Sequence, residues 1–298
     1  MNFTKLLFAV LMVSLFFVAS GFAAEWKDLH EKADSLTLNQ AQVLVKASPE
    51  SADNLYVLGL VYLNLHQDLQ AQDVFKKALD ANKQMYWAKW GLAESLRRQH
   101  RSDMAEPILN EVLTINAQFP PACVSLAYIK YMRMDFDGSV KLALKVIDQG
   151  RERVDLSNYV RGLALYAGAK GMIAHYGGVL SKAINGLAVK PNLDKAEKLQ
   201  PDSPAVLFGL GSYYFLAPVI AGGDKNKAEV YLKRAIEADP LFTDAYVRLA
   251  QLYNIRKDRN KYDLYMSKAV DIDPSNELIL DARSGKCKFI CMGGEERR

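Results

Sequence analysis

The sequence predicts an all-α protein, a solenoid of about six helix-turn-helix units behind an export signal. Three observations lead to this prediction. An apolar run close to the N-terminus is followed by small residues. Large and small apolar residues recur at helical spacing along the rest of the chain, in one register. Half of the residues are hydrophobic and only ten are proline, which is the composition of a folded chain.

The first 24 residues have the order of charge and hydrophobicity of a secretory signal. Lys5 gives a positive start, the run from Leu6 to Ala19 is apolar except for Ser14, and Gly-Phe-Ala-Ala follows. The run is short for a membrane span, which takes about 20 residues. We therefore expect residues 1–24 to be cleaved and the mature chain to be periplasmic or secreted, with no integral span. An uncleaved N-terminal anchor is the alternative.

Charge and motif content exclude several function classes. Loss of the signal removes one charge, that of Lys5, and lowers the formal net charge from +4 to +3. No basic block is present, so nucleic acid is not an expected partner. His30-Glu31 does not continue into a zinc-protease motif, and Leu280 stands where a phosphate loop before Lys286 requires glycine. We expect no enzyme activity, catalytic residues, metal or cofactor.

The chain has three cysteines, too few for a disulfide scaffold. Cys123 falls at a normally buried repeat position and is interpreted as a core thiol. Cys287 and Cys291 stand four residues apart near the C-terminus. A metal site needs more ligands than these two, so a disulfide or two free thiols are the alternatives left open.

The clearest helix pair lies in the segment that begins at residue 54. Leu55, Leu58, Gly59 and Tyr62 recur at intervals of three or four, and a second helix carries the small and large residues that follow. This pattern resembles the tetratricopeptide-repeat (TPR) family. The resemblance implies a right-handed superhelix of antiparallel helix pairs. In each pair small residues allow close approach, and large ones fill the space between repeats.

The same register continues along the chain. Pro240 and Pro274 end their repeats, because a residue that precedes proline avoids the helical conformation. A partial first repeat before Pro49 matches weakly. The residues taken as the repeat signature are Leu58, Gly59, Tyr62, Ala71, Gly91, Gly211, Tyr214, Ala228, Pro240, Ala250 and Pro274.

Two insertions interrupt the repeats. Residues 171–200 replace one ordinary helix and contain Gly177-Gly178, Gly186 and Pro191, which break a continuous helix. Residues 215–223 form the other insertion, and its glycines predict a turn before an N-cap at Asp224. The predicted organisation is a signal (1–24), a partial repeat (25–51), repeats (52–153), a degenerate repeat (154–203), repeats (204–276) and a C-terminal helix and tail (277–298).

The second insertion carries a looser resemblance. The stretch from Ser212 to Ala228, with Pro218 followed by Gly222-Gly223-Asp224, is similar to a turn of periplasmic TPR proteins, among them the T components associated with TRAP transporters. The resemblance covers residues 155–275. It implies a soluble helper of a substrate-capture system.

In TPR arrays the first helix of each repeat lines the concave face. The register places mainly apolar and aromatic residues there, and only the last repeat contributes polar ones, such as Asp244 and Gln251. The predicted groove residues are Tyr56, Leu60, Tyr128, Tyr131, Met132, Tyr159, Leu163, Tyr166, Phe208 and Phe215. Because large apolar surfaces mark binding sites, we expect a protein partner, so that the chain acts as a periplasmic interaction scaffold. A carrier of an apolar small molecule is the alternative.

A monomer rarely leaves so much apolar area in water. The groove is therefore expected either to be open to a partner or to be filled by the chain itself. Residues 171–200 and the N-terminal helix around Trp26 are the two segments considered as fillers.

Overall fold

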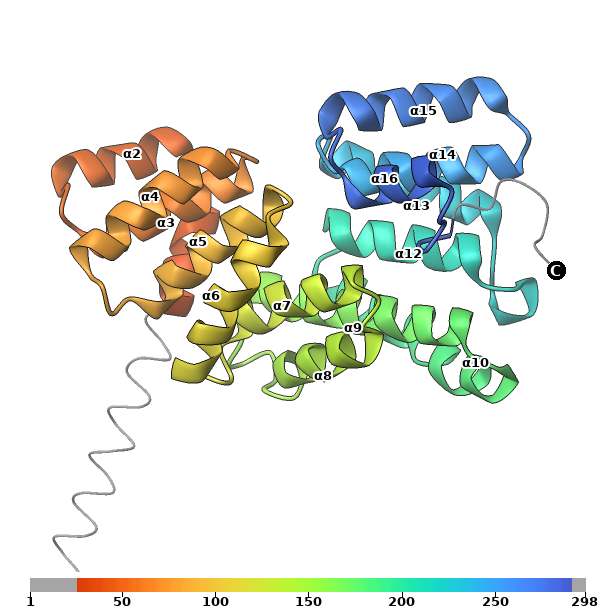
Figure 1. Ribbon diagram of the computed structural model, residues 1–298, viewed down its shortest axis with the longest axis horizontal. Helices are drawn as coiled ribbons and strands as arrows, with labels where there is room; N and C mark the ends of the chain where they lie inside the picture. The colour runs from red at the N-terminus through yellow and green to blue at the C-terminus, as the bar shows by residue number, and fades with distance from the viewer. Residues whose placement is uncertain (1–25, 291–298) are drawn as a thin grey trace, which may run out of the picture. The chain divides into compact units, whose positions relative to one another are not determined.

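The computed structural model describes residues 26–290, and within that range the regular structure is entirely helical (Figure 1). The predicted signal at 1–24 and Cys291 lie outside the described residues. The chain divides into two compact units, Met1–Ala117 and Gln118–Arg298. We call them unit 1 and unit 2 and describe each by itself. The boundary falls between two helix pairs inside the predicted block of repeats at 52–153.

Unit 1 begins with a helix at residues 26–35, and Thr37 then starts the next helix with a capping box shared with Gln40. The third helix begins after Ser51, whose side chain accepts from Asn54 N. These caps satisfy backbone N–H groups that have no partner in the first helical turn. The helices are α2 (Leu38–Ala47), α3 (Ala52–Asn64), α4 (Asp68–Ala81), α5 (Tyr86–Arg98) and α6 (Ser102–Ile115).

Helices α3 and α4 pair, α5 and α6 pair, and α4 also packs against α5. The Phe75 ring of α4 shows why two signature positions are glycine. A Cβ atom added at either Gly59 or Gly91 would lie 2.5 Å from this ring. Both neighbouring helices therefore approach Phe75 as closely as a backbone can, and a side chain at either position would force them apart.

Unit 2 continues the pattern with longer and less regular pairs. Its helices are α7 (Pro120–Met132), α8 (Phe136–Ile147), α9 (Leu156–Tyr176), α10 (Val179–Gly186), α11 (Val189–Leu199), α12 (Pro204–Leu216), η1 (Val219–Ala221), α13 (Lys225–Ala238), α14 (Thr243–Ile255), α15 (Arg259–Ile272) and α16 (Glu277–Ser284). The first helices α7, α9, α12 and α14 contact one another in that order, and α16 packs against α14. They form one layer, whose surface we call the first-helix face.

The predicted helix breaks in residues 171–200 are confirmed. Helix α9 ends at Tyr176 and is capped by Gly177, and α10 ends with Gly186. Pro191 lies in the first turn of α11, where its missing N–H costs nothing. Helix α11 then packs against α9 as the second helix of the pair.

The turn predicted at 215–223 is also confirmed. Gly222 has a φ of 90°, which favours glycine, and Asp224 caps α13 by accepting from Asn226 N and Lys227 N. Nearby, a Cβ atom added at Gly211 would lie 2.7 Å from Leu232 Cγ, so this signature glycine also marks a close helix contact.

Candidate functional site on the first-helix face

In unit 2 the first-helix face is covered by the chain's own C-terminal segment, residues 285–290. This segment follows α16 through Gly285, whose φ of 65° reverses the chain direction. It closes as a tight turn in which Ile290 N donates to Cys287 O over 3.4 Å. Phe289 and Ile290 are buried in a cluster with Phe136, Met172 and other residues of the unit. The segment is thus bound rather than merely adjacent.

Four hydrogen bonds hold the main chain of this segment. The Asp281 carboxylate accepts from Lys288 N at 2.9 Å and from Phe289 N at 2.8 Å. Arg248 Nη1 donates to Phe289 O at 3.1 Å, and the Tyr176 hydroxyl donates to Lys288 O at 2.6 Å. The partners come from α16, α14 and α9. Bonds to charged groups are the stronger kind, so the turn is recognised by its backbone as well as by its side chains.

The side chain of Phe289 rests on aromatic residues of the face. Its ring stacks on Tyr131 with 5.7 Å between centroids and 26° between planes. Tyr131 in turn meets the edge of Phe136, and Phe136 stacks on Tyr176. Burial raises the pKa of Tyr131 to about 12, because its phenolate would be poorly solvated here. The face therefore offers an aromatic platform for one aromatic side chain.

Beside this platform lies a buried polar group. Arg248 Nη1 also donates to Gln251 Oε1 at 2.9 Å, and the guanidinium lies 5.7 Å from the Phe208 ring centroid. Asp244 Oδ1 accepts from Asn276 at 2.8 Å. Burial raises the pKa of Asp244 and lowers that of Arg248, because desolvation disfavours each charged form.

The sequence reasoning anticipated a polar last repeat but missed Arg248, Asp281 and Phe289. The sequence could have indicated Arg248, because it lies four residues after Asp244 on the same side of the helix. Phe289 carried a weaker signal, an aromatic-aliphatic pair in an otherwise basic tail. Asp281 carried none, since its role depends on a turn that only the folded chain brings to it.

In unit 1 the corresponding helices are covered by a different element, the helix at residues 26–35. His30 Nε2 and the Tyr56 hydroxyl are hydrogen-bonded at 2.7 Å. The His30 ring also lies 5.3 Å from Trp90 and 5.2 Å from Trp26. Trp26 is 3% exposed and His30 is 7% exposed. The helix around Trp26, one of the two segments considered as fillers, thus packs against Tyr56 and Trp90 in unit 1.

The predicted groove residues divide into two sets. Five have side chains at most 6% exposed and cannot meet a partner without rearrangement, namely Tyr56, Leu60, Tyr159, Leu163 and Phe215. The other five are half-buried, namely Tyr128, Tyr131, Met132, Tyr166 and Phe208. Of these, all except Tyr128 pack against the cluster that contains Phe289. Their role in binding a partner stays a prediction.

Tyr159 illustrates why the first set differs from expectation. Its hydroxyl accepts a hydrogen bond from Lys195 of α11 at 2.7 Å, so the ring points toward the second helix of its own pair. Tyr159 therefore lies in the interface between α9 and α11 and not on the open face. Residues 171–200, the other filler considered, do not take that role: α11 pairs with α9, and α10 has no buried residue.

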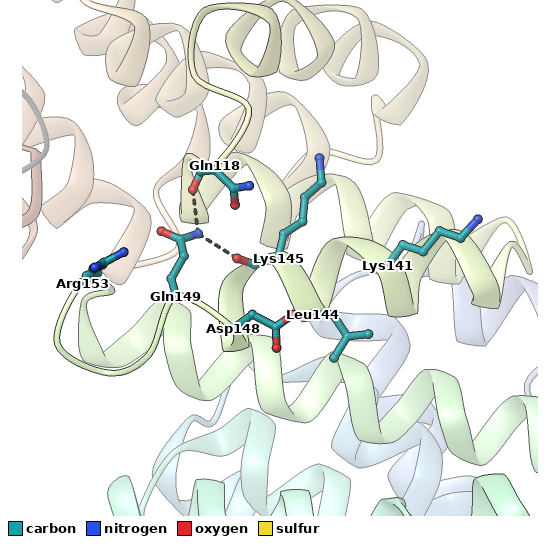
Figure 2. A pocket seen from close by; sticks show the side chains of 7 residues that line it. All are labelled: Gln118, Lys141, Leu144, Lys145, Asp148, Gln149 and Arg153. Atoms are coloured by element: carbon teal, nitrogen blue, oxygen red, sulfur yellow. Dashed lines mark hydrogen bonds between the residues drawn. The ribbon is translucent and has the colours of Figure 1, made fainter. Parts of the chain in front are cut away.

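A separate shallow hollow of about 510 Å³ lies along α8 (Figure 2). Gln149 Nε2 bridges the carbonyls of Gln118 and Lys145 at 2.8 and 2.7 Å. The cations Lys141, Lys145 and Arg153 around it are all exposed, as is Asp148. These side chains are solvated and converge on no common point, so we assign the hollow no function.

Within residues 26–290, no group of three or more His, Cys, Asp or Glu side chains is arranged to hold a metal ion. None of the helices in this range has the length and apolar character required to cross a bilayer. Cys123 is a buried thiol, and burial raises its pKa to about 11. Cys291, with which Cys287 was considered to pair, lies outside the described residues.

The comparison with known families matches two segments to the tetratricopeptide repeat, residues 52–85 and 243–276. These are the α3–α4 and α14–α15 pairs described above. The chain thus contains tetratricopeptide repeats in these two segments. No curated protein sequence matches the chain significantly. The looser resemblance of residues 155–275 to TRAP-associated proteins stays a prediction.

Solved structures show the same fold at low sequence identity. A thermophilic TPR protein from Thermus thermophilus is 18% identical, with a TM-score of 0.54 over 69% of this chain and 100% of that one. A TPR protein from Parabacteroides merdae is 13% identical, with a TM-score of 0.52 over 87% and 97%. The Cut9–Hcn1 complex of the APC/C contains a chain that is 15% identical, with a TM-score of 0.55 over 85% and 46%.

Proposed function

We propose that this TPR protein is an exported interaction scaffold that binds a protein partner through the first-helix face of unit 2. The TPR fold supports a scaffold in general terms. One observation carries the specific proposal: the face holds an apolar turn of the chain itself, with Phe289 on Tyr131 and with the backbone bonded to Asp281 and Arg248. A surface that binds one such turn in cis has the chemistry to bind another in trans.

The contacts define what the partner presents. The aromatic platform requires an aromatic side chain, and the neighbouring cluster takes the aliphatic Ile290. Asp281 requires two adjacent free N–H groups, while Arg248 and Tyr176 require carbonyls. The partner motif is therefore an exposed turn with an aromatic-aliphatic pair. An extended strand would present its N–H groups alternately to opposite sides and would not satisfy Asp281.

The bound segment is suited to displacement. Cys287 and Ile290 have φ values of 51° and 67°, a region that disfavours side chains and most of all β-branched ones. Such conformations cost about 1–3 kcal/mol each and persist only when surrounding contacts hold them. A partner turn with a relaxed backbone would make the same contacts without that cost.

One feature supports export: the N-terminal 24 residues have the order of charge and hydrophobicity of a secretory signal. No observation favours the small-molecule carrier. That alternative requires an enclosed pocket beneath residues 171–200, where α11 packs directly against α9.

Binding to arrayed loops tests the proposal. The Phe289→Ser, Ile290→Ser double variant uncovers the face, and disulfide-closed loops with a Phe-Ile pair should bind it at least tenfold more tightly than they bind the unaltered chain. Adding Tyr131→Ala removes the platform and should cost about 2 kcal/mol of binding. Tyr231→Ala is the matched control, since Tyr231 lies on α13 and bonds Glu197. Equal losses from both tyrosine changes, or no preference for Phe-Ile loops, would refute the proposal.

A further inference from the structure

Helix α10 has its polar and apolar sides reversed relative to an ordinary surface helix. Ser181 and Asn185 face α9: Ser181 Oγ donates to Ile173 O at 3.2 Å, and Asn185 Oδ1 accepts from Lys170 at 2.9 Å. The aliphatic side chains face water instead. The exposed fractions are 88% for Val179, 73% for Leu180, 61% for Ile184 and 77% for Leu187.

A second exposed aliphatic pair belongs to the same edge of unit 2. Val219 and Ile220, in the short helix η1, are 87% and 98% exposed. The helix η1 follows the end of α12 as α10 follows the end of α9, and α9 packs against α12 (Figure 1). Lys190 Nζ, just beyond α10, lies 5.7 Å from the Tyr214 ring, and the adjacent Tyr213 hydroxyl bonds Ala221 O. We call these six aliphatic residues the apolar rim.

Basic residues predominate in the segment that carries α10. No Asp or Glu occurs between Asp155 and Asp194, whereas Lys170, Lys182 and Lys190 do. Lys182 is exposed on α10 itself. The carboxylates that flank the rim in the sequence are engaged: Asp194 pairs with Lys190 at 2.5 Å and offsets its charge, and Asp224 caps α13.

We propose that the apolar rim docks onto an anionic lipid membrane and places Val179, Leu180, Ile184, Leu187, Val219 and Ile220 in the headgroup-acyl boundary. Aliphatic side chains beside lysines are the composition of interfacial helices that lie on a bilayer without spanning it. Anionic headgroups complement the cations. A protein partner fits less well, because the rim lacks the Trp and Arg anchors that dominate protein interfaces. None of the six rim residues belongs to the cluster that contains Phe289.

Hydrogen exchange on the full chain tests this docking at the level of single peptides. Vesicles of phosphatidylcholine with about a third phosphatidylglycerol should slow exchange in residues 177–190 and 217–223 at least fivefold, since desolvated amides exchange slowly. Phosphatidylcholine alone should have a much smaller effect. A local readout is needed because an uncleaved N-terminal segment would bring the whole chain to vesicles by itself.

Two matched variants complete the experiment. Leu180→Ser with Ile220→Ser should abolish the vesicle-dependent protection, while Val230→Ser with Leu264→Ser, at positions 57% and 49% exposed, should leave it intact. Unchanged circular dichroism would show that both variants fold. Protection equal with neutral vesicles would overturn the anionic requirement. The proposal would be overturned if vesicles gave no protection or if both variants lost protection equally. Protection that grows with protein concentration in the absence of lipid would also overturn it, in favour of a second copy of the chain.

Discussion

Both units cover the surface of their first helices with a terminal part of the chain, but the two covers differ in kind. Unit 1 uses a whole helix at residues 26–35, which inserts Trp26 and bonds His30 to a buried Tyr56. Unit 2 uses a turn of a few residues, held by one aromatic ring, one aliphatic side chain and four main-chain hydrogen bonds. A helix of that size is part of the core, whereas a short turn can leave without unfolding what lies beneath it.

The largest expected effect tests the cover of unit 1. Trp26→Ala should lower the free energy of unfolding of unit 1 by about 3 kcal/mol or more, as truncation of a buried tryptophan does elsewhere. Urea unfolding with hydrogen exchange as the probe measures it. If only residues 26–35 exchanged faster while α3 and α5 were unaffected, this helix could detach without unfolding the unit, as is expected of the turn on unit 2.

A substitution inside a helix pair provides a reference value for the free energy of unfolding with which the effects of both covers can be compared. Gly211→Leu should cost about 2 kcal/mol in unit 2, because its Cβ would meet Leu232 at 2.7 Å and overpacking is destabilising. Ala238→Leu adds the same side chain at an exposed position and serves as the control. Equal melting temperatures for the two variants would show that the glycine does not mark a tight contact.

Acid stability should reveal a part of unit 2 that does not depend on its cover. Desolvation alone would raise the pKa of Glu229, but hydrogen bonds from Lys233, Tyr253 and Arg256 outweigh it and lower the pKa to about 2. A lowered folded-state pKa stabilises the protein above the ordinary value and loses that contribution as the pH falls toward 2.

Glu229→Gln should therefore cost about 1.5 kcal/mol near neutral pH, the range for hydrogen bonds to a charged group. Its stability should also fall less than that of the unaltered chain between pH 4.5 and 2. Urea titrations at several pH values measure both effects. Parallel pH profiles for the two proteins would contradict the assignment.

The smallest effect on global stability is expected from Phe289→Ala. Because the turn is predicted to detach before the helices unfold, the free energy of unfolding of α14 should change by less than about 0.5 kcal/mol. Binding of the dye ANS to the native protein should nevertheless increase, since the aromatic platform becomes exposed. A loss of 3 kcal/mol or more, typical of a phenylalanine in a rigid core, would place Phe289 in the cooperative core.

The sequence was informative wherever a repeat imposes a local pattern. Gly59, Gly91 and Gly211 lie at close helix contacts, as their spacing predicted, and the breaks at Gly177 and Gly222 fall where expected. These features depend on neighbours within one or two helices. Periodicity in the chain therefore carries the necessary information.

The covers could not be derived in the same way. The stacking of Phe289 on Tyr131 and its bond to Arg248 join residues far apart in the chain, and no periodicity relates them. The side of α9 that Tyr159 faces depends on the position of Lys195 in α11. The exposed face of α10 follows from hydrogen bonds of Ser181 and Asn185 to α9, which a hydrophobicity pattern alone would place on the outside.

The central claim is that the turn on unit 2 is a bound segment that can leave its face. Residue-resolved hydrogen exchange of the Lys288 and Phe289 amides, both of which donate to Asp281, tests it most directly. The account predicts protection with an opening free energy well below that of the α14 amides, and almost independent of low urea concentrations. If the two amides exchanged only when the α14 amides did, the turn would be an inseparable part of the core. If they exchanged without any protection, the turn would not be bound.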